Sequence, residues 1–447
     1  MCILYIIMEL AKTLILLFLV ANISMCQDEY EWGGSKIIFV NEVCRHGARA
    51  PEVKGYENEQ FPNGNGMLTA SGMRQHYLLG TQLNKRYVNS SPKDKSKLLS
   101  HEFNNEEIYI RSTQVLRTIQ SAEVQMLGLY PLGSAKELDK DLVENAHPHI
   151  NIHNEAEIIR KLGKNAIEDG YRPIPAHNFD VYVDDMVAYG FCPYIVNDYL
   201  QRDKDPEIWK PYDDYFRPLI YYQLAKAFNT TPDQLDFKSV GSLSDILWAE
   251  DFQGIQNRYN FTEEEFEIVK QIQLPSLVEL LSDTSRSIMV SRMLNPVVEM
   301  MKSKIGLDYN QSLVQDFENS KFLLFSSHDY QLSQILKFLE PENLDYKYID
   351  YASVILYELH QSKSVKCKVW LDKNCYFVRA YFNNDQMKLP GCKKLDCKFK
   401  EFEAYIKQIG MTYDQMQTMC YEDIDLTPQD FRDYHDSMVE RQIISDI

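Results

Sequence analysis

One short segment near the start of the chain has residues suited to binding and attacking an anion. Residues 41–52 read NEVCRHGARAPE, so that Arg45 and Arg49 lie on either side of His46. Guanidinium groups match phosphate oxygens as planar, bidentate donors, and a neutral imidazole is a nucleophile. Gly47 has no side chain, so that backbone and substrate can approach closely there. The segment therefore suggests an anion site with a nucleophile in its floor.

Two other segments supply what this one lacks. His328 and Asp329 end the segment KFLLFSSHD, and Arg111 lies in EEIYIRST. His328 and Arg111 can donate to phosphate oxygens, while Asp329 can protonate a leaving alcohol. Alone, Asp329 could simply cap a helix, and RHGAR could be a solvated basic loop. The combination instead suggests a site that binds a phosphate group.

All three segments follow or contain an apolar run typical of a buried strand. Strands are expected within 35–44, 106–113 and 321–329, each followed by a segment with helical spacing of apolar residues. The carboxyl ends of parallel strands meet at one edge of a sheet, where helix N-termini offer N–H groups to anions. That edge would hold Arg45, His46, Arg49, Arg111, His328 and Asp329.

The order of these elements predicts an α/β protein. The β-α-β-α order of the first part is followed by a Tyr-, Asp- and Pro-rich region with few strands, and strands return after residue 300. We expect a three-layer α/β/α sandwich with a mixed central sheet and a mainly helical inserted cap domain. The expected parts are a signal peptide at 1–26, the core at 27–133 and 301–427, the insert at 134–300 and a peripheral tail helix at 428–447.

Composition limits the partners of the chain. Its 447 residues have a formal net charge of −18, which argues against nucleic acid or an anionic membrane surface. The segment from Leu14 to Ala21 is apolar but shorter than a spanning helix, and Lys12 precedes it. We expect a cleaved signal peptide, no stable membrane span in the mature chain, and a secreted or lysosomal location in the secretory pathway.

Cysteines and glycosylation sequons fit that compartment. Seven of the nine cysteines follow the expected signal peptide, and an odd number leaves at least one thiol free or paired between chains. Four N-x-S/T triplets predict glycosylation. They are at Asn89, Asn229, Asn260 and Asn310.

RHGARAP at 45–51 together with HD at 328–329 resembles the two signatures of the histidine acid phosphatases, the branch of the histidine phosphatase superfamily that also contains phytases. The segments LTASGMRQHYLLG, IYIRST, YASVILYEL and LPGCKKLDC extend the likeness over roughly residues 36–420, with the insert the least similar part. The resemblance implies an acid phosphatase that cleaves phosphomonoesters with neither metal nor cofactor.

The resemblance also implies a role for each residue. His46 would attack phosphorus and form a phosphohistidine, and Asp329 would protonate the leaving group, which predicts an acid optimum. The oxygens of the phosphoryl group would be bound by Arg45, Arg49, Arg111 and His328.

Some residues depart from the family pattern. Tyr330 replaces the threonine that many relatives have after HD, and we expect its bulk to narrow the pocket. Val354 replaces a family cysteine. The resemblance implies disulfides Cys192–Cys420 and Cys392–Cys397, with Cys367–Cys375 as a local replacement for the missing one and Cys44 as the odd, buried thiol.

Other functions remain open. A phytase of the same family is the nearest alternative, although the insert has few clustered Lys or Arg. A metal-dependent hydrolase could use His147, His149 and His153, and a silent binding protein could keep the fold. A homodimer is compatible with the sequence, which does not fix the natural substrate.

Overall fold

The structure is a computed structural model. It describes residues 34–54, 59–143, 145–181, 183–184, 192–255, 259–364, 367, 373–421, 424, 426–439 and 441–442. The expected signal peptide lies outside this part, as does most of the segment KCKVWLD (366–372), for which the sequence also predicts a strand.

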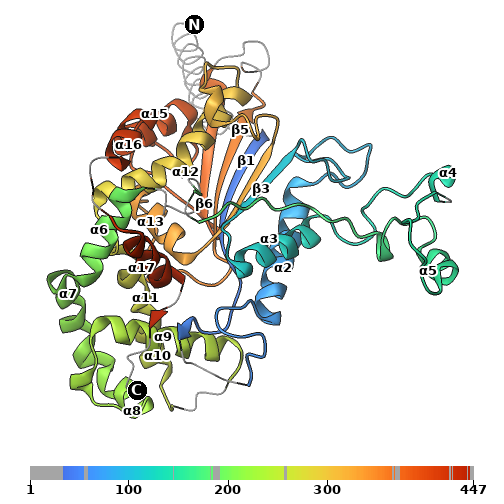
Figure 1. Cartoon of the computed structure of the whole chain (residues 1–447). Coiled ribbons are helices and arrows are strands. Elements are labelled where there is room, and N and C mark those ends of the chain that lie inside the picture. Colours follow the sequence, from blue (N-terminus) through green and yellow to red (C-terminus); the bar gives the residue numbers. More distant parts are fainter. Residues whose placement is uncertain are drawn as a thin grey trace, which may run out of the picture.

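A mixed sheet lies at the centre of the molecule (Figure 1). Its neighbours in order are β3, β4, β1, β5, β6 and β7, and β8 pairs with β6. β3, β4 and β1 are parallel, whereas β5 runs antiparallel to β1, and β6 runs antiparallel to β5. The bounds are Ser35–Arg45 (β1), Ile108–Ser112 (β3), Phe322–Ser327 (β4), Val354–Ser362 (β5), Tyr376–Phe382 (β6), Asp385–Gln386 (β7) and Cys397–Lys398 (β8).

Helices cover both faces of the sheet, which confirms the predicted three-layer sandwich. Side chains of β1 alternate between two cores, because successive strand residues point to opposite faces. Phe39 and Val43 face one core, and Val40 and Cys44 face the other. On the Val40 side lie α2 (Ala70–Tyr87) and α3 (Leu116–Leu129); on the Phe39 side lie α12 (Asp283–Lys304), α13 (Asp329–Leu339) and α15 (Phe399–Ile409).

The insert is mainly helical, as predicted. Helix α12 spans the expected boundary at residue 300 and contacts β1 of the sheet. Residues 134–170, with α4 and α5, project from the body in Figure 1. The helices are α4 (Lys140–Val143), α5 (Glu155–Leu162), α6 (Pro193–Lys204), α7 (Pro206–Phe216), α8 (Tyr222–Ala227), α9 (Phe237–Phe252), α10 (Glu263–Gln271) and α11 (Gln273–Val278).

The C-terminal tail is packed more deeply than the expected peripheral helix. Helix α17 (Pro428–Val439) begins at its proline, but Tyr434 is buried and its ring lies edge-on to Tyr199 of α6, with centroids 4.9 Å apart. Beyond it, β9 (Arg441–Gln442) pairs in parallel with β2 (Val53–Lys54). The tail therefore contacts the insert and the segment that follows the RHGAR loop.

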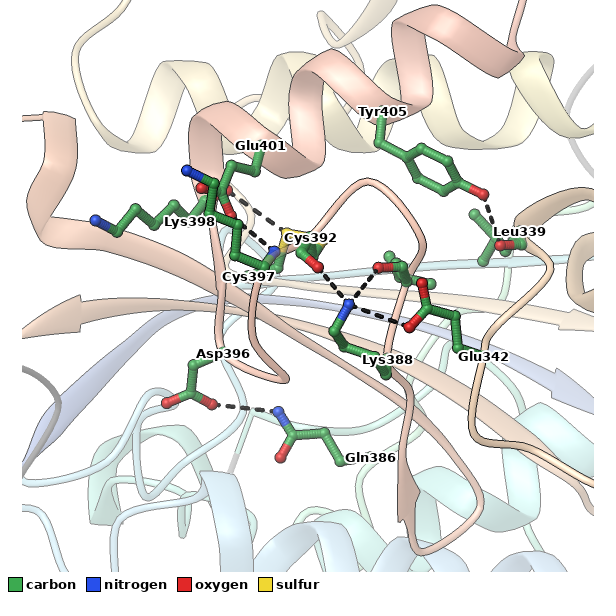
Figure 2. Close-up of a disulfide and its surroundings, with 12 residues drawn as sticks. Leu339, Glu342, Gln386, Lys388, Cys392, Asp396, Cys397, Lys398, Glu401 and Tyr405 are labelled. Atoms are coloured by element: carbon green, nitrogen blue, oxygen red, sulfur yellow. Dashed lines mark hydrogen bonds and ion pairs between the residues drawn. A yellow bond between two sulfur atoms is a disulfide. The ribbon is translucent and has the colours of Figure 1, made fainter. Parts of the chain in front are cut away.

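Three disulfides join the pairs expected from the sequence, and Cys44 is a buried free thiol. Cys192–Cys420 links α6 of the insert to α16 (Tyr413–Cys420). Figure 2 shows Cys392–Cys397 beside Tyr405, whose hydroxyl donates to the carbonyl of Leu339, 2.8 Å away, at the end of α13. Tyr405 thus joins α15 to the C-terminal end of α13.

The sequons differ in their surroundings. Asn229, Asn260 and Asn310 are exposed. Asn89 is buried, and its Nδ2, the atom to which a glycan attaches, donates to the carbonyl of Leu99 at 2.6 Å. The structure therefore argues against the glycan expected at Asn89.

A buried carboxyl group lies in the middle of β1. Glu42 is fully buried, and burial raises its pKa from an ordinary 4.5 to about 8, although a hydrogen bond from Gln125 Nε2 at 2.8 Å opposes this rise. Glu42 is therefore protonated in the folded chain at acidic and neutral pH. Because its folded pKa is the higher one, its contribution to stability is complete below about pH 4.5 and is lost as pH rises toward 8.

We expect Glu42→Gln to remove this pH dependence. Between pH 4.5 and 7 the wild type loses about 3 kcal/mol of unfolding free energy through this group, and the amide, which does not ionise, loses none. Denaturant unfolding of both proteins at the two pH values measures the difference. An equal decline in wild type and variant would contradict the expectation.

Candidate active site

The pairing of β1 with β4 brings the two predicted signatures together. Arg45 ends β1 opposite Ser327, which ends β4, so His46 and His328 leave the sheet side by side. The two imidazole rings are edge-on, with centroids 5.4 Å apart. The backbone N–H of His46 donates to the backbone carbonyl of Ser327 at 3.0 Å. The predicted meeting of both segments at the carboxyl edge of the sheet is what the structure shows.

The loop after β1 is fixed by α2 and α3. The N–H of Gly47 donates to Ser121 Oγ at 3.1 Å, and that of Ala48 to Gln75 Oε1 at 2.8 Å. A Cβ at Gly47 would lie 2.4 Å from the carbonyl oxygen of Gly72 in the first turn of α2. A glycine is therefore required at position 47 because the backbone of α2 packs directly against it.

His46 is held in the form that a nucleophile needs. Its Nδ1 lies 2.8 Å from the carbonyl oxygen of Gly47, and because a carbonyl only accepts, Nδ1 carries the hydrogen. The lone pair is therefore on Nε2. Burial lowers the pKa of His46 well below its usual 6.5, and the charges of Arg117, Arg45 and Arg49 lower it further, so the ring is neutral.

Arg45 and Asp329 form a partly buried ion pair across the strand ends. Arg45 Nη2 is 2.8 Å from Asp329 Oδ2, and Nη1 donates to the carbonyl of Ile349. The guanidinium also lies over the ring of Tyr351, 4.2 Å from its centroid. Asp329 is the first residue of α13, and its Oδ1 accepts from the N–H of Tyr330 at 2.9 Å.

Arg49 is tied to the insert. Its two terminal nitrogens donate to the two oxygens of Asp245 in α9, at 3.0 and 3.1 Å, and Nη2 lies 3.4 Å from Glu52 Oε2. Such a bidentate pair fixes the orientation of the guanidinium. Asp245 thereby links the loop after β1 to the helical insert.

Arg117 contacts His328, and Arg111 is paired with Asp184. Arg111 Nη2 is 2.6 Å from Asp184, and its guanidinium lies over Phe179, 4.4 Å from the ring centroid. In the first turn of α3, Arg117 is 3.3 Å from His328 Nδ1 and 2.8 Å from Glu52 Oε1. Sequence reasoning missed Arg117, although its place at the start of the helix after β3 was a usable signal.

The ring of His328 is already occupied on both sides. Nδ1 faces the Arg117 guanidinium, which only donates, so Nε2 carries the hydrogen and donates to Thr113 Oγ1 at 3.0 Å. Burial, followed by the charge of Arg117, lowers its pKa well below 6.5. To donate to a phosphoryl oxygen, as expected, the Nε2 hydrogen of His328 would therefore have to give up its hydrogen bond to Thr113 Oγ1.

Tyr330 does not narrow the site. Its side chain is buried in the hydrophobic core that also contains Tyr199 and Tyr434. The expectation of a bulky pocket wall is wrong, because residue 330 is the second of α13 and its side chain packs into the core.

The three histidines of the metal alternative are exposed on the projecting segment. His147 Nδ1 is 2.9 Å from Glu155 Oε1, an ordinary surface pair. Among the described residues, no group of three or more His, Cys, Asp or Glu side chains is arranged to hold a metal ion. His147, His149 and His153 therefore do not form a metal site here.

The family follows from a match that covers most of the chain. Residues 36–383 match the model of the histidine phosphatase superfamily, branch 2. The chain belongs to this family. Lysosomal acid phosphatase of Xenopus laevis is 26% identical to this histidine phosphatase over 384 residues, 83% of this chain and 76% of the relative. Prostatic acid phosphatase of Homo sapiens is 25% identical over 390 residues, 82% and 84% of the two chains.

Solved structures share the fold of this histidine phosphatase. The phytase of Klebsiella sp. ASR1 superposes with a TM-score of 0.55 at 12% identity, covering 88% of this chain and 100% of that one. The phytase of Hafnia alvei gives 0.54 at 13% identity, covering 87% and 98%. At these identities the likeness concerns the fold alone.

We expect Gly47→Ala to lower the free energy of unfolding of the histidine phosphatase by about 1–3 kcal/mol, because the added methyl group would clash with the backbone of Gly72, which cannot rotate away. The variant should also lose most of its phosphatase activity. Denaturant unfolding and phosphatase assays measure the two effects. Ala70→Ser, at the exposed first residue of α2, is the control and should shift stability by less than about 0.5 kcal/mol. A fully active, stable Gly47→Ala variant would contradict the close packing.

Proposed function

We propose that this histidine phosphatase is an acid phosphatase that hydrolyses phosphate monoesters through a phosphohistidine on His46. The observation that carries the proposal is the state of that ring. Its Nδ1 hydrogen is fixed on the Gly47 carbonyl, so the Nε2 lone pair is free among the arginines that surround it. A neutral imidazole with a fixed tautomer is a suitable nucleophile toward phosphorus.

In the first step, the phosphoryl oxygens bind Arg45, Arg49 and Arg117. His46 Nε2 forms a bond to phosphorus while the bond from phosphorus to the ester oxygen breaks, and Asp329 gives its proton to that oxygen. In the second step, Asp329 takes a proton from water, which attacks phosphorus and releases His46 and phosphate. Side chains of this chain supply every group, so the route includes no metal and no cofactor.

The charge balance favours simple esters over polyanionic ones. Arg45, Arg49 and Arg117 are paired with Asp329, Asp245 and Glu52, respectively. A phosphoryl group has to compete with these carboxylates, and further phosphates on the substrate would meet them as like charges. We therefore favour a monoesterase of low-charge substrates over a phytase, the alternative within the family.

We place the protein in the secretory pathway, as a secreted or lysosomal enzyme. Relatives include lysosomal and prostatic acid phosphatases, and three disulfides fit an oxidising compartment. Among the described helices, none is long and apolar enough to cross a membrane. We propose glycans at the exposed sequons Asn229, Asn260 and Asn310.

We expect a radiolabelled phosphomonoester to yield an acid-labile, alkali-stable phosphoenzyme that is absent in His46→Ala. Rapid quenching at low substrate concentration, followed by denaturing electrophoresis, detects it. Cys44→Ala is the matched control: it removes the neighbouring buried thiol and should keep the label. Label that persists in His46→Ala, or that is missing from active wild type, would refute the nucleophile assignment.

Arg117 and Arg111 allow a direct comparison. We expect Arg117→Ala to weaken inhibition by inorganic phosphate at least about tenfold, because a charge-assisted hydrogen bond is lost, and Arg111→Ala to act mainly on stability through Asp184. The double variant Arg117→Ala/Glu52→Gln controls for the unpaired carboxylate. Weaker phosphate inhibition in Arg111→Ala than in Arg117→Ala would reverse the assignment.

A further inference from the structure

A series of three hydrogen bonds runs from the middle of β1 to the residue before the nucleophile. Gln125 Nε2 of α3 lies 2.8 Å from Glu42 Oε1, and Gln125 Oε1 lies 2.9 Å from His76 Nδ1 of α2. On the other side of its ring, His76 Nε2 lies 3.1 Å from the carbonyl oxygen of Arg45. Glu42, His76 and Gln125 are completely buried, so their polar groups have to satisfy one another.

The last of these bonds bears on the position of His46. The peptide unit between Arg45 and His46 is held at its N–H, which donates to the carbonyl of Ser327. Its carbonyl oxygen faces His76 Nε2. A carbonyl only accepts, so this second bond exists only while Nε2 carries a hydrogen. The tautomer of His76 therefore determines whether the peptide next to the nucleophile is held at one polar group or at both.

The orientation of the Gln125 amide determines that tautomer. Burial lowers the pKa of His76 from 6.5 to about 4, although the bonds to Gln125 and Arg45 oppose this, so at neutral pH one ring nitrogen carries a hydrogen. If the amide oxygen faces Nδ1, that hydrogen is on Nδ1 and the bond to the Arg45 carbonyl is lost. If the amide N–H₂ faces Nδ1, the hydrogen is on Nε2 and the bond is made.

The protonation state of Glu42 in turn determines the orientation of the amide. An ionised Glu42 only accepts, so Gln125 presents Nε2 to it. A protonated Glu42 needs an acceptor for its hydrogen, and among the described residues its Oε2 has no hydrogen-bond partner. The hydrogen can be satisfied on Oε1 if the amide turns over and presents its oxygen. The two ends of an amide are nearly alike in shape, so this turn exchanges the bonds with little movement of other atoms.

We propose that His76 is a positioning residue for His46 and that Glu42 sets its tautomer through Gln125. With Glu42 protonated, this hydrogen-bond relay runs from the Glu42 hydroxyl to the Gln125 oxygen and from the Gln125 N–H₂ to His76 Nδ1. His76 Nε2 then donates to the Arg45 carbonyl. With Glu42 ionised, the direction of the relay is reversed and the bond to Arg45 is lost. The inference rests on the proposed function in so far as His46 is the nucleophile.

The relay should reverse as pH rises through about 8, the value to which burial raises the pKa of Glu42. Burial raises the pKa of Cys44 on β1 and of Tyr87 on α2 well above their ordinary values, so both stay neutral near pH 8. On β5, hydrogen bonds from His360 and Arg86 outweigh burial and lower the pKa of Glu358 to about 2, so it stays ionised. The residues paired with Glu42 in the sheet do not titrate: they are Leu324 and Leu356.

The test observes the tautomer directly. In protein labelled with nitrogen-15 at histidine, the shifts of the two ring nitrogens show which of them carries a hydrogen. The signals of His76 are identified by their loss in His76→Asn or, if that variant does not fold, by nuclear Overhauser contacts with the Gln125 amide. We expect the hydrogen on Nε2 at neutral pH and on Nδ1 as pH rises from about 7 to 9.5.

The variant Glu42→Gln and a second histidine provide the controls. The amide of Glu42→Gln can donate to Gln125 as the acid does and does not ionise, so Nε2 of His76 should keep its hydrogen at every pH. Nε2 of His360 should keep its hydrogen in wild type, because it lies 3.0 Å from the ionised Glu358. A hydrogen on both nitrogens of His76 at neutral pH, on Nδ1 alone, or on Nε2 with no change up to about pH 9.5 would overturn the inference.

Activity tests the positioning role. For 4-nitrophenyl phosphate, which scarcely needs protonation of its leaving group, we expect kcat of wild type to fall about fivefold more than kcat of Glu42→Gln between about pH 7 and 9. Glu107→Gln is the matched control: hydrogen bonds from Lys321 and Ser100 outweigh burial and lower the pKa of Glu107, so this variant should follow wild type. A merely structural role of Glu42 would change kcat equally at both pH values, and that result would contradict the proposal.

The tautomer of His76 is measured without any turnover, which separates this inference from the proposed function. If the tautomer changes with pH and no phosphoenzyme forms on His46, the proposed function fails and the relay stands. If the phosphoenzyme forms and the tautomer does not change, only the relay fails.

Discussion

The site depends on one contact in the sheet, the parallel pairing of β1 with β4. This pairing sets Arg45 opposite Ser327, so the two strands end at the same level. His46 and His328 then follow as adjacent residues of two loops, and α13 begins at once with Asp329. A shift of register by one residue would turn every side chain of the strand to the other face, and the two signatures would no longer meet.

Burial of so much positive charge imposes a second constraint. Arg45, Arg49 and Arg117 are all nearly inaccessible to water, and an isolated buried charge is costly. Carboxylates offset this cost, and they come from different parts of the fold: Glu52 follows the loop after β1, Asp245 belongs to the insert, and Asp329 starts α13. Through Asp245, the insert is therefore part of the electrostatics of the site.

Local sequence patterns were enough to predict the sandwich and the meeting of the two signature segments at one edge of the sheet. Apolar runs marked β1, β3 and β4, and residues after parallel strands share an edge. Arg111 lies one residue before the end of β3 and is paired with Asp184, a partner that the sequence did not predict.

The partners of the site residues carried no such signal. Asp245 and Gln273 reach Arg49 and Asp329 from distant helices, and nothing in their spacing marks them. Tyr330 was misjudged because the direction of a side chain at a helix start depends on the packing of that helix.

The disulfide between Cys192 and Cys420 bears on how substrate enters. It joins the start of α6, within the helical insert, to the end of α16, 228 positions later. A covalent link at that point restricts hinge motion of the insert, so large domain closure around a substrate is disfavoured. Recognition then relies on a preformed site, and little of the binding energy is spent on conformational change.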